Sequence, residues 1–182
     1  MRSISITILL TIFSGLAISQ ANKGYGISFK IDGLSDSTVY LAYHLGDKQY
    51  LKDSVRLDKT GHCLFSGKES LPQGIYMIVL PGRKYFEMLI SEKQIFSVTC
   101  NYQDYFKTLK FSGSDENSAF IDYQKKWVSM QDDANRIDSR IQSNKSNNDS
   151  IRVLSELRKT QEDKMKAYLT EVINKNKGSL IL

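Results

Sequence analysis

The sequence predicts an α+β fold: an antiparallel β-sandwich or partly open barrel of about eight strands, followed by a helical hairpin. Three observations lead to this prediction. Between residues 24 and 111, short runs with alternating apolar residues are separated by turn residues. No helical pattern interrupts these runs, which favours antiparallel pairing. After Gly113 the spacing of apolar residues changes to three and four, which is typical of amphipathic helices.

An export signal precedes the predicted fold. Met1-Arg2 is positively charged, an apolar run follows from Ile4 to Ile18, and small residues near Ala21 suit a cleavage site. The run is too short for a typical membrane span, and polar residues follow it at once. We therefore expect a signal peptide over residues 1–21, an exported mature protein with the periplasm as its compartment, and no later membrane span.

The first predicted strands carry apolar residues at every second position. Their members are Tyr25, Ile27, Phe29 and Ile31, then Val39, Leu41 and Tyr43, then a weaker set of Leu51, Val55 and Leu57. A period of two is typical of a half-buried strand, so each set is expected on one face. Residues 58–61 predict a hairpin turn in which Gly61 supplies a positive φ.

The remaining strands are expected at residues 62–66, 75–80, 85–90, 95–100 and 105–111. The run at 75–80 is apolar on both faces, which is typical of a central strand. Pro81-Gly82 predicts a tight turn after that strand. The β-domain is therefore predicted to span residues 22–112.

The second predicted unit, residues 113–182, is a pair of antiparallel helices. Ser114 is placed to cap the first helix, and the acidic residues that follow suit the positive end of a helix dipole. Its apolar stripe consists of Phe120, Tyr123, Trp127, Met130, Ala134, Ile137 and Ile141. A polar break at 143–150 separates the helices, and Asp149 is the expected second cap.

The second helix has a shorter stripe and a polar middle. Residues 158–164 are strongly polar and are expected to be solvated. Gly178 is expected to end the helix. The three large apolar residues at 180–182 resemble the start of another buried element, so we expect the chain to be truncated before a further domain. The apolar stripe is formed by Leu154, Leu157, Met165, Tyr168, Leu169 and Val172.

Charge and cysteine content exclude some classes of partner. The 25 basic and 20 acidic residues are interspersed, and loss of Arg2 with the signal lowers the net charge from +5 to +4. This pattern predicts no nucleic-acid partner. Cys63 and Cys100 form neither a C-x-x-C motif nor a metal-ligand cluster, so no metal and no cofactor is expected. An oxidising compartment permits a disulfide between them, whereas their phase on alternating runs equally fits two separate buried thiols.

No group of side chains predicts catalysis, so no catalytic residue is assigned. His62 is next to Cys63, but neighbours on a strand point to opposite faces, so the two cannot act as base and nucleophile. His44 is expected at a surface or turn. Adjacent acids diverge by about 100° on a helix and are expected to face solvent or cap; these pairs are Asp115-Glu116 and Asp132-Asp133.

Tyrosines are the remaining candidates for a binding role. Aromatic pairs across neighbouring strands account for most of them. The sharper alternative is a tyrosine-lined groove that recognises a glycan or a peptide. The helical stripe that contains Trp127 is expected to be core. The tyrosines on or beside predicted strands are Tyr40, Tyr43, Tyr50, Tyr76, Tyr85, Tyr102 and Tyr105.

Glycines and aromatics at strand and turn positions resemble a known domain. The segments are GYGISFKIDGL at 24–34, TVYLAYH at 38–44, GDKQY at 46–50, FSGK at 65–68 and GIY at 74–76. They are similar to the β-rich domain of unknown function at the N terminus of exported thioredoxin-like proteins of the TlpA/ResA type. In those proteins a helical segment follows, and then a thioredoxin fold with a redox C-x-x-C. The resemblance covers about residues 24–177.

The redox motif of that family has no counterpart in this sequence. The resemblance therefore implies a non-catalytic accessory domain, not an enzyme, which positions or pairs a thioredoxin-like redox domain. Its expected partner is that domain, missing from this chain or present as a separate protein, and a homodimer is a second expectation. The alternative function is a stand-alone exported β-sandwich module that binds a peptide or a glycan.

Overall fold

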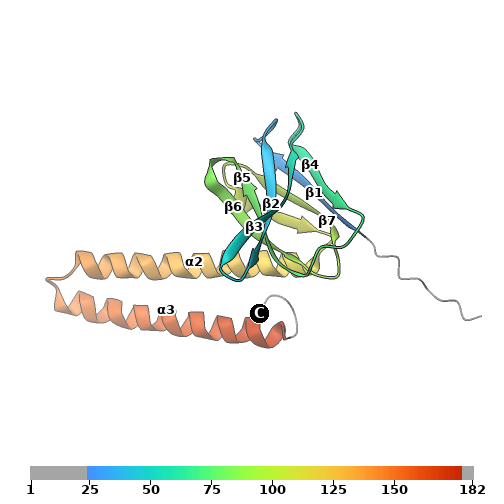
Figure 1. The fold of residues 1–182 in the computed structure, drawn as a ribbon. Helices are drawn as coiled ribbons and strands as arrows, with labels where there is room; N and C mark the ends of the chain where they lie inside the picture. The colour runs from blue at the N-terminus through green and yellow to red at the C-terminus, as the bar shows by residue number, and fades with distance from the viewer. Residues whose placement is uncertain (1–23, 178–182) are drawn as a thin grey trace, which may run out of the picture.

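The computed structural model describes residues 24–177. Within these residues it contains eight strands in two four-stranded sheets, followed by two long helices (Figure 1). The predicted α+β class is confirmed, as two packed sheets rather than a closed barrel. The predicted signal peptide, the expected stop at Gly178 and the apolar residues 180–182 lie outside the described residues.

One sheet has the strand order β4-β1-β7-β8. It consists of β1 (Tyr25–Asp32), β4 (His62–Gly67), β7 (Ile95–Asn101) and β8 (Lys110–Ser112). β1 pairs antiparallel with β4 but parallel with β7, where Ile27 lies opposite Phe96. This parallel pair differs from the antiparallel pairing expected throughout. It arises because the chain builds all four strands of the other sheet, and β4, between β1 and β7 and then returns on the side of β1 away from β4.

The second sheet has the order β3-β2-β5-β6, formed by β2 (Thr38–Leu45), β3 (Lys48–Arg56), β5 (Gly74–Leu80) and β6 (Lys84–Ile90). β5 is a central strand, as predicted. The register of β2 with β3 shifts so that Leu41 pairs with Asp53 but Ala42 pairs with Leu51, which leaves Lys52 as an extra residue. A bulge reverses the alternation of faces. The prediction that Leu51 shares a face with Val55 is therefore wrong, and Leu51 is 63% exposed.

The core lies between the two sheets. Phe29 and Phe65 meet edge to face with ring centroids 5.7 Å apart, and both are fully buried.

The turn from β3 to β4 is held by the Asp58 carboxylate, which accepts hydrogen bonds from the Thr60 hydroxyl and from the His62 N–H. Those two bonds lower the pKa of Asp58 to about 2. The turn at 58–61 is thus confirmed, with Gly61 at φ +81°.

The stretch from Tyr105 to Phe111, predicted as one strand, is instead a short helix and a short strand. α1 (Tyr105–Thr108) comes before β8 in the chain. Its helical turn forms because the Asp104 carbonyl accepts hydrogen bonds from both the N–H and the hydroxyl of Thr108. Only residues 110–112 remain extended and pair with β7. The predicted turn after β5 is confirmed as the 3-10 turn η1 (Pro81–Arg83), in which Gly82 has φ +72°.

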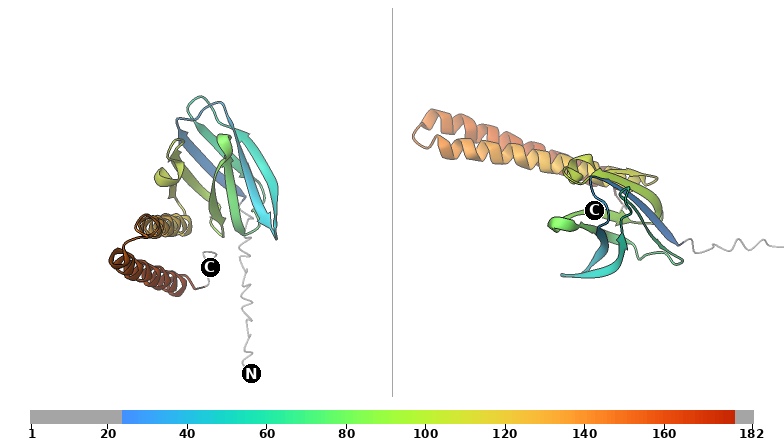
Figure 2. Two further views of the ribbon diagram at one scale, coloured as in Figure 1. Left: turned by 90° about the vertical axis from the view of Figure 1, so that its left-hand side faces the viewer. Right: turned by 90° about the horizontal axis from the view of Figure 1, so that it is seen from above.

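Two long helices, α2 (Asp115–Ser143) and α3 (Asn148–Lys175), form the hairpin. α2 runs beneath the sandwich and extends beyond it, and α3 packs on the side of α2 away from the sheets (Figures 1 and 2). The predicted cap is confirmed, since the Ser114 hydroxyl accepts from the N–H of Asn117 at 3.3 Å. Asp149 is not the second cap. The Asn147 side chain accepts from the N–H of Ser150 at 3.0 Å, so α3 begins two residues earlier than a cap at Asp149 would allow.

The helical interface is narrower on α3 than its apolar pattern predicts. On α2 the buried members of the predicted stripe are Phe120, Met130, Ala134 and Ile137. On α3 only Leu154 and Gln161 are buried, and Leu157 is 44% exposed. None of the helices within residues 24–177 has the length and apolar character needed to cross a membrane.

Candidate functional site

The junction between sandwich and hairpin is held by the side chain of Asn117 in the first turn of α2. Its Oδ1 accepts from the backbone N–H of Leu89 at 2.7 Å, and its Nδ2 donates to the Leu89 carbonyl at 2.8 Å. Nδ2 also donates to the Ser114 hydroxyl at 3.0 Å. The amide thus pairs with the edge of β6 as a neighbouring strand residue would. Asn117 is 1% exposed, so these bonds are made away from solvent.

The same helix also binds the edge of the other sheet. The Ser118 hydroxyl donates to the Phe111 carbonyl in β8, and the Lys125 ammonium donates to the Leu109 carbonyl at 2.8 Å. Burial lowers the pKa of Lys125, and the nearby Asp122 carboxylate opposes that shift. α2 therefore bridges the open side of the sandwich, where the edge strands of the two sheets face it.

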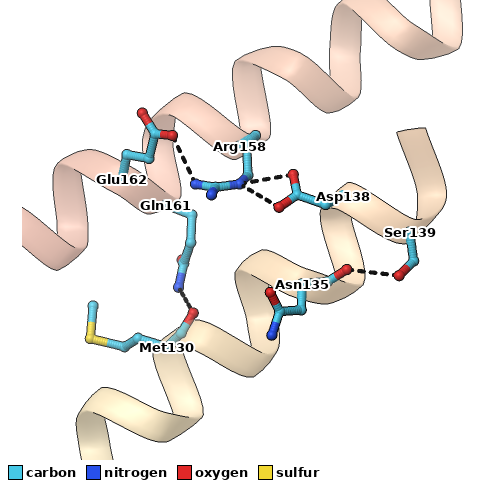
Figure 3. Close-up of polar contacts among 7 residues, drawn as sticks. All are labelled: Met130, Asn135, Asp138, Ser139, Arg158, Gln161 and Glu162. Carbon is cyan, nitrogen blue, oxygen red and sulfur yellow. Dashed lines mark hydrogen bonds and ion pairs between the residues drawn. The ribbon is translucent and has the colours of Figure 1, made fainter. Parts of the chain in front are cut away.

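A polar layer fixes α3 against α2 (Figure 3). The Gln161 amide donates to the Met130 carbonyl at 2.9 Å, and Gln161 is 9% exposed. Arg158 binds Asp138 on the opposite helix at 2.9 Å and Glu162 on its own helix at 3.0 Å. The prediction that residues 158–164 are all solvated is therefore wrong. Such contacts fix the register of two helices, because a shift would leave the polar groups unpaired.

An aromatic group lies where α3 returns alongside the first half of α2. The ring of Tyr123 stacks on Trp127 of the same helix at 6.5 Å between centroids and on Tyr168 of α3 at 6.1 Å. Burial raises the pKa of Tyr168. Trp127 is half-buried beside Tyr123, so the expectation that its stripe is core holds for the buried members of the stripe and not for Trp127 itself.

A groove of about 300 Å³ opens between β6, α1 and α2. Gln124, two turns after Asn117 on α2, donates to the Glu87 carboxylate at 3.3 Å. The Oε1 atom of Gln124 is buried and has no hydrogen-bond partner within residues 24–177. The groove combines aromatic surface with these polar groups; its lining residues are Tyr85, Phe86, Glu87, Tyr105, Phe106 and Gln124.

The two cysteines are free thiols on strands that β1 separates. Cys63 lies opposite Phe29, and Cys100 lies opposite Ile31 on the other side of β1. Of the two alternatives, the structure has separate thiols rather than a disulfide. Burial raises the pKa of each to about 11. Thiol–disulfide exchange needs an accessible thiolate, and neither cysteine provides one at neutral pH.

The other residues singled out from the sequence do not converge. His62 is exposed whereas its neighbour Cys63 is half-buried, which confirms that the two face opposite ways. His44 is exposed at the end of β2. Within residues 24–177 no group of three or more His, Cys, Asp or Glu side chains is placed to hold a metal ion.

Several tyrosines form the cross-strand pairs that the sequence predicts. Tyr43 on β2 stacks on Tyr50 of β3 at 5.6 Å and meets Tyr76 of β5 at 5.8 Å. Tyr102 donates to the Pro81 carbonyl, and the Lys84 ammonium lies 4.0 Å from its ring centroid. Of the tyrosines named from the sequence, Tyr85 and Tyr105 line the groove beside β6, while Tyr40 is 41% exposed on the outer side of β2.

The family comparison matches the sandwich together with the start of α2. The matching family model is described as "Domain of unknown function (DUF4369)" and covers residues 25–120, more than half of the chain. The chain belongs to this family. The comparison with curated proteins finds no match. The DUF4369 segment extends past the predicted boundary at residue 112 and includes Asn117, so the bonded junction with β6 lies within the matched domain.

Sequence reasoning missed the amides that organise this DUF4369 domain. Asn117 and Gln124 lie on α2 with Ile121 between them, on a second stripe beside the main apolar one. Gln94 plays a role like that of Asn117, since it accepts from the N–H of Leu71 at 2.7 Å and donates to its carbonyl at 2.9 Å. The sequence around these amides is itself polar, since Asn117 lies between Glu116 and Ser118, and Gln94 follows Lys93. It therefore does not show which backbone the amide will pair with.

Proposed function

We propose that the chain is a non-catalytic accessory module of an exported thioredoxin-like protein, in which the sandwich and hairpin hold the redox domain in a fixed place. The family match supports the domain, and the resemblance to TlpA/ResA-type proteins supplies the redox partner. The raised pKa values of the two separated thiols support a role other than dithiol exchange.

The observation that carries the proposal is the bonding of α2 to both sheets. Asn117 binds β6, while Ser118 and Lys125 bind the other sheet at or beside β8. Because three side chains of one continuous helix hold two different sheets, the hairpin cannot turn about the sandwich without breaking them. A rigid arm of this kind suits a module that fixes the position of another domain.

The hairpin also determines where its second helix ends. Tyr168 stacks on Tyr123, so the second half of α3 lies beside the first half of α2, near the sandwich. Figure 1 shows α3 running back beneath the sheets. In the proposed arrangement the redox domain follows α3 and is held close to the junction, on the side of the hairpin that the sheets leave open.

The first test is the coding sequence beyond the codon for Leu182. We expect it to encode a thioredoxin-like segment with C-x-x-C, and a continuation without one refutes the proposal. In that longer protein, spin labels on β4 and on the redox domain are expected to give a narrow distance distribution. Asn117→Ala should broaden it, while Asn135→Ala on the exposed face of α2 should not. A broad distribution in the unmodified protein also contradicts positioning.

A second candidate function, a stand-alone module that binds a peptide or glycan, is favoured by the aromatic groove beside β6. A glycan and peptide array probed with residues 22–182 separates the two functions. A stand-alone module selects a ligand that survives washing, whereas a positioning module retains none on the array.

A further inference from the structure

Within residues 24–177, α2 bonds the outward backbone groups of β6 at one residue. Asn117 binds the N–H and the C=O of Leu89. In an antiparallel pair, every second residue directs both backbone groups away from the neighbouring strand. The register of β5 with β6 is continuous, so Tyr85 and Glu87 direct theirs to the same side as Leu89. Among residues 24–177, no partner outside the β5–β6 ladder is found for these backbone groups.

The groove lies directly along this unpaired part of the edge. Tyr85 and Glu87 form one wall, Tyr105 and Phe106 of α1 a second, and Gln124 of α2 a third. Its volume of about 300 Å³ is at the lower end of the range for ligand sites, about 300–1,000 Å³. Two residues of a strand span about 6.6 Å, so a short extended segment can pair with both Tyr85 and Glu87.

Two hydrogen-bond acceptors of the groove, Gln124 Oε1 and the Glu87 carboxylate, receive few hydrogen bonds. Among the described residues, Gln124 Oε1 has no partner and the Glu87 carboxylate has only the 3.3 Å contact from Gln124 Nε2. The terminal torsion of glutamine is broad, so its amide turns toward a ligand at little cost. Lys84 is already engaged with Tyr102 at the start of β6. Excess acceptor capacity therefore lies at the Glu87 end of the groove, where it suits a cationic donor.

We propose that the edge of β6 at Tyr85–Glu87 binds an extended peptide segment of a partner protein as an added strand, with a lysine or arginine of that segment opposite Glu87. The backbone of the segment pairs with the free N–H and C=O groups of Tyr85 and Glu87. Its basic side chain donates to the Glu87 carboxylate and to Gln124 Oε1, and its apolar atoms contact Tyr85 and Tyr105.

A sugar suits this site less well than a strand does. The unpaired groups repeat as alternating donors and acceptors along a straight edge, and only another extended backbone matches that spacing. Pairing over two residues is a weak interaction in isolation. It is sufficient for a segment of a partner protein that other contacts already hold near the chain, because its effective concentration is then high. This weak binding is distinct from the washing-resistant ligand binding of the second candidate function, and it does not depend on the positioning role.

The test is a titration of the isotope-labelled mature chain with an acetylated and amidated peptide, Thr-Val-Lys-Val-Thr, followed by NMR. We expect the amide signals of Tyr85, Glu87 and Gln124 to shift together, with a Kd of about 1 mM. Methylating one alternate set of peptide amides should weaken binding about tenfold, since one lost hydrogen bond is worth about 1 kcal/mol or more. Methylating the other set should leave binding within about twofold, because those amides face solvent.

The charge preference is tested with a second peptide that has glutamate in place of lysine. The unmodified chain should bind it about tenfold more weakly, since a charge-assisted hydrogen bond is worth about 1.5–3 kcal/mol. Glu87→Gln should abolish the difference, and the exposed-charge control Glu92→Gln should keep it. Shifts confined to other residues, equal effects of both methylation patterns, a lysine preference that survives Glu87→Gln, or no shift at about 10 mM peptide overturn the proposal.

Discussion

Replacement of Asn117 by alanine tests the bonded junction most directly. The change removes both partners of Leu89, whose side chain is fully buried beside α2. A buried backbone group left without a partner costs about 1–3 kcal/mol, so two such groups predict a loss of about 2–6 kcal/mol in the free energy of unfolding. Water that enters the vacated space brings the loss toward the lower figure. Against a typical total of about 5–15 kcal/mol, the effect is large.

Urea denaturation followed by circular dichroism measures this loss as a lower midpoint at unchanged slope. Hydrogen exchange supplies the local measurement, because the Leu89 amide should be strongly protected in the unmodified chain and should exchange far faster in the variant. Asn135→Ala, also on α2 but exposed, should change stability by no more than about 0.5 kcal/mol. A cost of Asn117→Ala below about 0.5 kcal/mol with unchanged protection of Leu89 refutes the reasoning.

Three further outcomes are expected. Gly61→Ala should lower the free energy of unfolding by about 2 kcal/mol or more, since φ is +81° and a Cβ meets a backbone oxygen at 2.5 Å. The matched Gly46→Ala, at φ +58° in open space, should cost about 1 kcal/mol, and equal shifts in the melting temperatures of the two variants contradict this. Gln161→Met should change the free energy of unfolding, measured by urea denaturation, by less than about 1 kcal/mol, since the side chains are similar in size and the acceptor carbonyl keeps its helical bond; a loss above about 2 kcal/mol would show that the amide is essential to the hairpin. Alkylation of Cys63 and Cys100 by iodoacetamide at pH 8 should be about a hundredfold slower than in the urea-unfolded chain, because only the thiolate reacts and burial raises each pKa to about 11. The rate should rise about tenfold per pH unit toward pH 11, and a rate that levels off below pH 9 contradicts this.

The strands and core could be predicted because their pattern is local. Ile27, Phe29 and Ile31 alternate with polar residues, and all three are fully buried between the sheets. The cap at Ser114 could likewise be predicted, because a hydroxyl residue directly before acidic residues and an apolar stripe is a local signal for the start of a helix. Where hydrophobic period and turn chemistry act over a few residues, the sequence determines the element.

The errors occur where a tertiary contact or one inserted residue changes the local pattern. Lys52 is the extra residue of the bulge in β3, and it turns Leu51 to the opposite face without any change in the apolar composition of the strand. Tyr105 and Phe106 have strand propensity, but Thr108 closes a helical turn over them. These effects depend on single hydrogen bonds or on single residues of the pairing register.

The candidate site was the least predictable part of the molecule. Gln124 belongs to the candidate site because it lies two turns after Asn117, beside a strand edge. The residues of that edge come more than thirty positions before Gln124 in the chain. No pattern within α2 distinguishes it from a solvated glutamine. The groove of aromatic residues beside a sheet edge was foreseen only as a class of site, and its location required the packing of α1 and α2 against β6.

The placement of β1 at the centre of its sheet has a consequence for the order in which the chain folds. β2 with β3 and β5 with β6 are hairpins whose partners are close in sequence, so that sheet can begin to assemble as soon as residue 90 is made. β1, although it is synthesised first, has neighbours on both sides only after Asn101. Pairing over such separations is slow because it requires closure of long loops. The earliest strand thus completes its pairing among the last, and the side of β1 that receives β7 stays accessible while the later strands are being made.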